Sequence, residues 1–153
     1  MIERRKARQA ALELLYQREI FECSLADAVS RQAHAAPDKP LPEFSLRLLQ
    51  GIDVNQRAID KLIDKHAKNW AIDRLPLIDR NILRIALYEM LFEPSIPVSV
   101  SINEAIELAK VFGSAESGKF INGVLGQVAV SLGDRDKVPS SGKRRPSEPR
   151  YLL

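Results

Sequence analysis

Apolar residues recur at three- and four-residue intervals along most of the chain, which is the period of an amphipathic helix. The first such stretch covers residues 3–21. Ser24 is typical of a helix N-cap and predicts a second helix that reaches about Ala33. Prolines and small residues over 35–42 predict a loop, and Pro42 can open the next helix.

The helical period continues through the middle of the chain. It predicts helices over 43–51 and 54–70, with a bend or break at Gly51. Residues 77–92 form a strongly periodic stretch, which Pro94 closes. Because only one short run of alternating residues interrupts this pattern, the sequence predicts an all-α fold.

Two more helices complete the prediction. Ser101 and Glu104 have the spacing of a capping box, so we expect a helix to begin at Ser101 and to reach about Phe112. A last helix is expected from Ser114 or Ser117 onward. Within it, glycines destabilise an isolated helix, and we expect them to allow close approach of a neighbouring helix. These glycines are Gly123 and Gly126.

The character of the chain changes after Leu132. The chain holds 23 Lys and Arg and 20 Asp and Glu, of which residues 133–153 contain six and three. Residues 1–132 therefore hold 17 of each and are neutral, so the whole positive excess lies in the tail. The tail is also rich in proline and serine, which favours disorder. We expect a helical domain over 1–132 and a disordered basic tail over 133–153.

Several classes of function find no support in the composition. Cys23 is the single cysteine, so a disulfide framework is excluded. No apolar run approaches the length of a membrane span and the N-terminus does not resemble a secretory signal, so we expect a cytoplasmic protein. The two histidines lack metal-ligand spacing, and no phosphate-binding loop or nucleophile elbow occurs. The sequence predicts no metal, no cofactor and no enzymatic activity.

The basic start of the chain is the first candidate site. Arg4, Arg5, Lys6 and Arg8 fall within one and a half helical turns, and Tyr16 lies on nearly the same face. Arginine binds phosphate through paired hydrogen bonds, and an aromatic ring can stack on an unpaired base. The alternative is a solvated first turn, and the spacing alone does not decide between the two.

A second candidate site lies where the last two predicted helices meet. A loop of small residues over 113–118 leads into a helix N-terminus, with Phe112 before it and Lys119 and Phe120 after it. Backbone amides and a lysine can bind phosphate while a ring stacks on a base. The alternative assigns both phenylalanines to the core, and it is the stronger interpretation for Phe112.

The polar side of residues 77–92 is a candidate for protein binding. Asp79, Arg80, Arg84 and Glu89 lie on it, with Asp73 nearby. Their spacing also fits a plain exposed helix face.

Three sequence blocks, in order and with their spacing, resemble the NusB family of bacterial transcription antitermination factors. They are Asp73–Glu89, Ile102–Lys110 and Lys119–Leu125. The basic opening with Tyr16 is also similar to that family, and the resemblance covers about residues 3–132. It implies a compact bundle of about seven helices in two packed halves.

The resemblance also implies a function. The family binds the single-stranded boxA element of nascent RNA together with the small-subunit ribosomal protein NusE. The complex joins elongating RNA polymerase with other Nus factors and suppresses termination, notably in ribosomal RNA operons. Matching positions imply an RNA surface at Arg4, Arg5, Lys6, Arg8, Tyr16, Phe112, Lys119 and Phe120. They imply a NusE surface at Asp73, Asp79 and Arg80.

Two other functions stay open at this point. A similar domain forms the N-terminal RNA-binding part of RNA cytosine methyltransferases, although no glycine-rich cofactor-binding domain follows it in this sequence. The chain could also be a helical adaptor or a homodimer without a specific role in RNA binding. Neutral residues at positions 4, 5 and 8 would leave such an adaptor's function intact.

Overall fold

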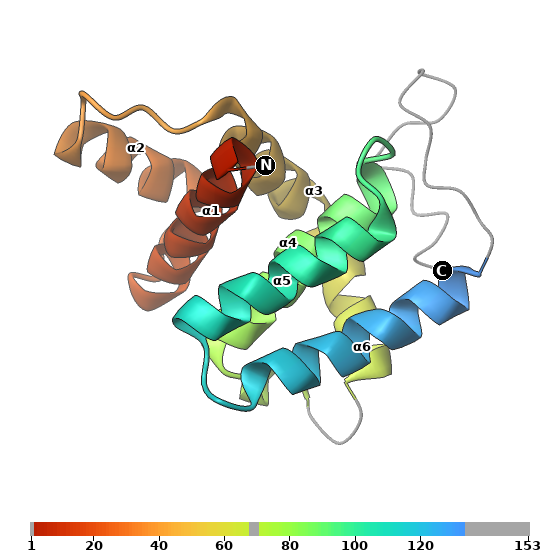
Figure 1. Cartoon of the computed structure of the whole chain (residues 1–153). Coiled ribbons are helices and arrows are strands. Elements are labelled where there is room, and N and C mark those ends of the chain that lie inside the picture. Colours follow the sequence, from red (N-terminus) through yellow and green to blue (C-terminus); the bar gives the residue numbers. More distant parts are fainter. Residues whose placement is uncertain (1, 68–70, 134–153) are drawn as a thin grey trace.

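The computed structural model describes residues 2–67 and 71–133, and every regular element within these ranges is a helix (Figure 1). The elements are α1 (Ile2–Ile20), α2 (Leu25–Ala35), α3 (Glu43–His66), the 3-10 helix η1 (Ile72–Arg74), α4 (Leu77–Phe92), α5 (Val98–Phe112) and α6 (Ser117–Leu132). The predicted all-α class is confirmed. Two predictions lie outside the described residues: the helix end at 68–70 and the tail at 134–153.

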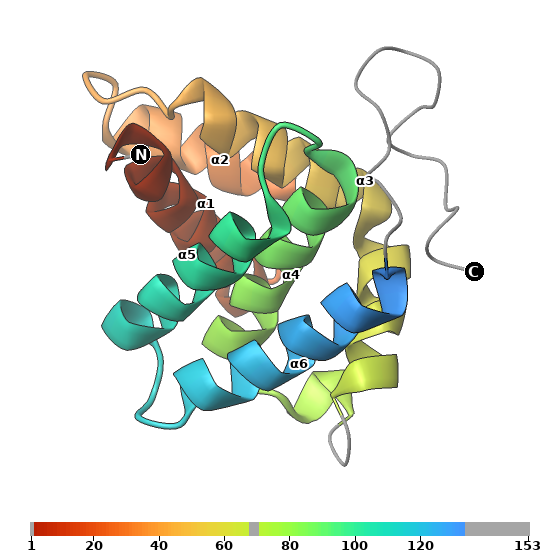
Figure 2. The same ribbon diagram turned by 45° about the vertical axis from the view of Figure 1, so that its right-hand side comes forward.

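Helix α4 is the central element of the bundle. It packs against α1, α3, α5 and α6, with α1 and α2 on one side and α5 and α6 on the other, while α3 contacts both α1 and α6 (Figures 1 and 2). All residues from Asn81 to Glu93 are buried. The predicted exposed polar face of this helix is therefore wrong: Arg84 and Glu89 lie inside the molecule, where ion pairs with neighbouring helices compensate their charges.

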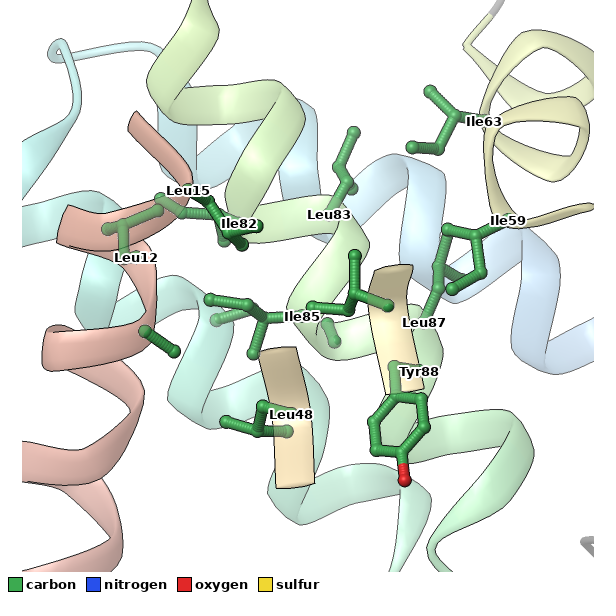
Figure 3. Packing of buried hydrophobic residues seen from close by; sticks show 14 of the residues in the cluster. Leu12, Leu15, Leu48, Ile59, Ile63, Ile82, Leu83, Ile85, Leu87 and Tyr88 are labelled. Atoms are coloured by element: carbon green, nitrogen blue, oxygen red, sulfur yellow. The ribbon is translucent and has the colours of Figure 1, made fainter. Parts of the chain in front are cut away.

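One continuous apolar core joins the two halves. Figure 3 shows side chains of α1 and α3, such as Leu15 and Ile59, around Ile82, Leu83 and Leu87 of α4. A buried leucine or isoleucine contributes about 1.5–3 kcal/mol relative to an exposed one. The core therefore fixes helices α1, α3 and α4 relative to one another.

The predicted capping box at Ser101 is wrong. Helix α5 begins three residues earlier, at Val98 after Pro97, whose φ of −59° suits a helix start. Ser101 lies inside the helix, and its hydroxyl donates a 2.8 Å hydrogen bond to Glu89. The Glu104 carboxylate is paired with Arg5 instead of the Ser101 amide. By contrast, the N-cap at Ser24 is confirmed, because its oxygen accepts from the Asp27 amide at 3.0 Å.

Glycine allows close packing at a different position from the one predicted. Helix α3 runs unbroken through Gly51, and a Cβ there would lie 2.1 Å from the Tyr88 ring. The predicted break is therefore wrong, and Gly51 makes room for Tyr88. Gly123 and Gly126 have no neighbouring atom within 4 Å of such a Cβ, so the close approach expected at these two positions is absent.

Helix length and hydropathy also bear on membrane insertion. Within the described ranges, no helix is both long enough and apolar enough to cross a membrane.

Candidate nucleic-acid interface

The first turns of α1 lie between α3 and α5, and each basic residue there has a different environment. The Arg4 guanidinium lies over the Phe44 ring of α3, 4.6 Å from its centroid. Arg5 donates two hydrogen bonds to Glu104 of α5, from Nε at 3.0 Å and from Nη2 at 2.7 Å. Lys6 is exposed. The structure thus presents one lysine and two partly engaged arginines at this surface.

Arg8 lies in the interior. Only 4% of the residue is exposed, and it donates to both carboxylate oxygens of Glu89, at 2.6 Å and 3.0 Å. It shares the buried face of α1 with Ala7 and Ala11. A direct RNA contact by Arg8, which the resemblance implied, therefore lacks an exposed guanidinium. The residue instead anchors the basic turn to α4.

Glu104 is negatively charged at neutral pH in this setting. The hydrogen-bonded Arg5 guanidinium holds the pKa of the Glu104 carboxyl below its usual value of 4.5, and the charge of Arg8 acts in the same direction. The Arg8 Nη1 atom lies 3.6 Å from Oε1 of Glu104. The carboxylate therefore contacts two of the four cations of the basic turn.

The second candidate site is built around the start of α6. Lys119 is exposed, whereas Phe112 and Phe120 are half-buried and pack against the core. The prediction that both phenylalanines belong to the core is thus correct for the buried part of each ring. Phe120 additionally lines two pockets that lie on the surface, so its ring is accessible from outside.

Glu116 and Phe120 line both pockets. The first pocket, of about 360 Å³, reaches inward to α4 and is lined by Leu75, Pro76, Asp79, Ser114, Glu116, Ser117 and Phe120. The second, of about 430 Å³, lies between α3 and α6 and is lined by His66, Glu116, Lys119, Phe120, Gly123, Val124 and Gln127. The Phe120 ring is thus placed to contact a flat group in either pocket.

The three residues expected to face a protein partner are not equivalent. Asp73 is exposed in η1. Asp79 is buried, accepts a 2.7 Å hydrogen bond from Ser117 and lines the first pocket. Arg80 is half-buried and donates to Glu19 and to the Leu75 carbonyl.

Helix α5 carries residues that lie near both candidate sites. Glu104, beside the basic turn, and Phe112, at the helix end, are eight residues apart, which is about 12 Å along a helix. Tyr16 is 39% exposed and lies further along α1. The two candidate sites are therefore joined by one rigid helix.

Some functional candidates were not found from the sequence. Phe44 supports Arg4, and Glu104 was assigned to a helix cap although it binds Arg5. His66 lines the second pocket, and the sequence predicts for the histidines only that they hold no metal. No local signal marks any of these roles, because each depends on a contact between helices distant in sequence.

Exposed cations beside accessible aromatic rings are typical of proteins that bind single-stranded nucleic acid through phosphates and stacked bases. The comparison with known proteins gives a more specific result. The chain belongs to the NusB family, whose family model matches residues 5–130.

Similar proteins and structures extend over most of the chain. A transcription antitermination protein NusB from Myxococcus xanthus is 42% identical over 134 residues, which are 84% of this chain and 96% of that protein. The Bacillus subtilis protein of the same name is 42% identical over 131 residues, with 86% and 98% covered. The T. maritima NusB structure has a TM-score of 0.73 at 41% identity and covers 81% of this chain and 88% of its own.

One further structure contains the antitermination factors NusB and NusE in complex with double-stranded RNA. Its matching chain has a TM-score of 0.73 at 27% identity, with 83% of this chain and 96% of that chain covered.

Proposed function

We propose that this chain is a transcription antitermination factor that binds boxA single-stranded RNA in nascent transcripts, ribosomal RNA transcripts among them, together with the ribosomal protein NusE. In this role it joins the elongating RNA polymerase complex with other Nus factors, in the cytoplasm, and it catalyses no reaction. Family membership supports the proposal, as do relatives of the same name that match over nearly their full length.

The observation that carries the RNA-binding part is the position of Phe120. Its ring lines two pockets, and Lys119 beside it is exposed. A ring next to an ammonium group can stack on an unpaired base while the charge meets the adjoining phosphate. This surface would be continuous, along α5, with the basic turn of α1.

We assign the residues of the RNA surface by their exposure. Direct contacts are proposed for Arg4, Arg5, Lys6, Tyr16, Phe112, Lys119 and Phe120. Arg8 contributes indirectly, since its buried pair with Glu89 fixes the basic turn. The helical domain over 1–132 would hold this whole surface.

The NusE surface is proposed around η1 and the start of α4. Asp73 is exposed and can contact a partner directly. A basic side chain of the partner could enter the first pocket and reach Asp79. Arg80 would have to exchange Glu19 for a new partner, so its contribution to affinity is expected to be small.

The test is fluorescence anisotropy with a boxA-like single-stranded RNA and a scrambled RNA of equal length, each with and without purified NusE. We expect selective binding of the boxA-like RNA that tightens when NusE is added. Equal weak binding of both RNAs, unchanged by NusE, would refute the proposal. Size-exclusion chromatography of the same samples distinguishes a homodimer of the free chain from the heterodimer.

Two variants of α6 test the role of the ring. Phe120→Leu keeps an apolar side chain in the core but removes the stacking surface, and we expect about tenfold weaker RNA binding. Val130→Ala is the control, because Val130 is 80% exposed on the same helix and lines neither pocket. Equal affinity of the two folded variants would remove Phe120 from the RNA site.

A methyltransferase function is disfavoured by the same comparisons. The chain covers 96% and 98% of two relatives that are named as antitermination proteins. Binding to NusE distinguishes an antitermination factor from a methyltransferase, and the fluorescence-anisotropy experiment with added NusE measures this binding.

A further inference from the structure

The pair between Arg5 and Glu104 joins two helices through residues 99 positions apart in the sequence. Both hydrogen bonds use one edge of the guanidinium group, the edge that carries Nε and one N–H of Nη2. The Arg5 side chain is 50% exposed, and that of Glu104 is 16% exposed. The pair thus lies at the surface, with the carboxylate on its inner side.

The other edge of the Arg5 guanidinium is available for a ligand. Nη1 has no hydrogen-bond partner within residues 2–67 and 71–133. A guanidinium group carries five N–H donors in one plane, so pairing through Nε and one N–H of Nη2 leaves two parallel donors, one on Nη1 and one on Nη2, at its terminal edge. Because two hydrogen bonds fix the plane, the outer edge has a defined direction.

The pair presents little net charge. Arg5 is neutralised by Glu104, and the neighbouring Arg8 is neutralised by Glu89. A phosphate near Arg5 would also approach the Glu104 carboxylate, and like charges repel. Lys6, which is exposed and forms no ion pair with the part of the chain that the structure describes, is the better phosphate ligand of the same turn. Arg5 therefore offers directed hydrogen bonds, and Lys6 offers charge.

Two parallel donors in a fixed plane match two parallel acceptors. Guanine carries such a pair, O6 and N7, and arginine binds them through two hydrogen bonds. In single-stranded RNA this edge of the base is open. A neutralised, oriented arginine thus fits a base edge better than it fits the sugar–phosphate backbone.

We propose that Glu104 is a specificity-determining positioning residue: it orients Arg5 to read the O6/N7 edge of an unpaired guanine and weakens the attraction of the basic turn for phosphate in general. This inference rests on the proposed RNA binding. It adds that Arg5 recognises guanine in the bound RNA, whereas Lys6 binds phosphate.

The experiment replaces each guanine of a bound RNA in turn by 7-deazaguanine, which lacks the N7 acceptor. In the natural protein, one position should lose about tenfold in affinity, as expected when the contact of arginine with O6 and N7 loses one of its two hydrogen bonds. In Glu104→Gln and in Arg5→Lys, the same replacement should have less than a threefold effect. Arg5→Lys keeps the positive charge at an exposed position, so a folding defect is not expected.

The second measurement is the salt dependence of binding to a scrambled RNA without guanine. Glu104→Gln should bind this RNA more tightly, with a logarithmic salt slope steeper by about 0.7 for each additional phosphate contact. Glu107→Gln is the matched control, because it removes the same charge one turn away, where Glu107 pairs with Lys110. It should leave the guanine effect intact.

The outcomes separate the two proposals. If the natural protein binds no RNA selectively, the proposed function fails. If it binds selectively but no guanine position is sensitive, or if Glu104→Gln behaves as Glu107→Gln does, only the role of Glu104 is overturned. Thermal melting of each variant confirms that the comparison is made between folded proteins.

Discussion

At the scale of single residues, the same side-chain type has opposite roles within one helical turn. Arg5 and Arg8 are three positions apart, and both pair with glutamates of other helices. Arg5 stays half-exposed, whereas Arg8 is buried and hydrogen-bonded to Glu89, which also accepts from Ser101. A charge in the interior is tolerated only when paired, so Arg8 contributes to the fold and Arg5 is left for a ligand.

This contrast predicts different effects of two alanine substitutions on stability. Arg8→Ala removes both hydrogen bonds that the buried Glu89 carboxylate accepts from the Arg8 guanidinium, which we expect to lower the free energy of unfolding by about 3–5 kcal/mol. Lys6→Ala changes an exposed side chain and should alter it by less than about 0.5 kcal/mol. Urea denaturation followed by circular dichroism measures both.

A stability loss below about 1 kcal/mol in Arg8→Ala would contradict the buried pairing. An RNA-binding defect in this variant has to be judged against its folded fraction. Lys6→Ala, which should remain fully folded, is therefore the cleaner probe of electrostatic RNA binding.

At the scale of elements, the packing of α3 on α4 depends on glycine at position 51, which has no side chain. The Tyr88 ring lies against Gly51 of α3, and the Tyr88 hydroxyl donates to the buried carboxylate of Glu93 at 3.0 Å. Burial, together with the charge of Glu93, raises the pKa of the Tyr88 hydroxyl above its usual value of 10, so it remains a donor. The ring therefore cannot move away from α3 without losing this hydrogen bond.

Substituting glycine by alanine at two helical positions should have opposite effects. Gly51→Ala places a methyl group into the Tyr88 ring and should destabilise the protein by about 1–3 kcal/mol. Gly123→Ala meets open space in α6 and should stabilise it by up to about 1 kcal/mol, the difference in helix propensity. Differential scanning calorimetry gives the direction of each shift, and an unchanged melting temperature in Gly51→Ala would contradict the close packing of Tyr88 on Gly51.

At the scale of the whole molecule, charge is distributed unevenly along the chain. Residues 1–132 are neutral, and the positive excess lies in 133–153, mostly outside the described residues. Favourable contacts with phosphates release counterions whatever the base sequence. The tail is therefore expected to add affinity for RNA in general, while the helical domain supplies selectivity.

A triple substitution in the tail tests this division. Glutamine at Lys143, Arg144 and Arg145 should weaken binding of a scrambled RNA and reduce the salt slope by up to about 2, while the preference for the boxA-like RNA rises. The control removes three charges from the exposed face of α3, at Arg57, Lys61 and Lys65. Equal effects of the two triples would indicate that general charge, and not the tail, sets the nonspecific affinity.

The sequence by itself determined the elements formed by neighbouring residues and the family. Leu77–Phe92 was predicted with its observed bounds, the Ser24 cap was correct, and the three blocks that resemble the NusB family identified it correctly. Periodicity, proline positions and N-caps act over three or four residues, so they can be read directly from the chain.

Only the tertiary structure decided which polar residues face solvent. The partners of Arg5 and Arg8 are 99 and 81 positions away, and Tyr88 meets Gly51 across two helices. A helical period shows that a face is apolar, but it does not show that α4 is covered on all sides. Because burial and ion pairing depend on which helices become neighbours, they placed Arg8 in the interior and left the outer edge of Arg5 open at the surface.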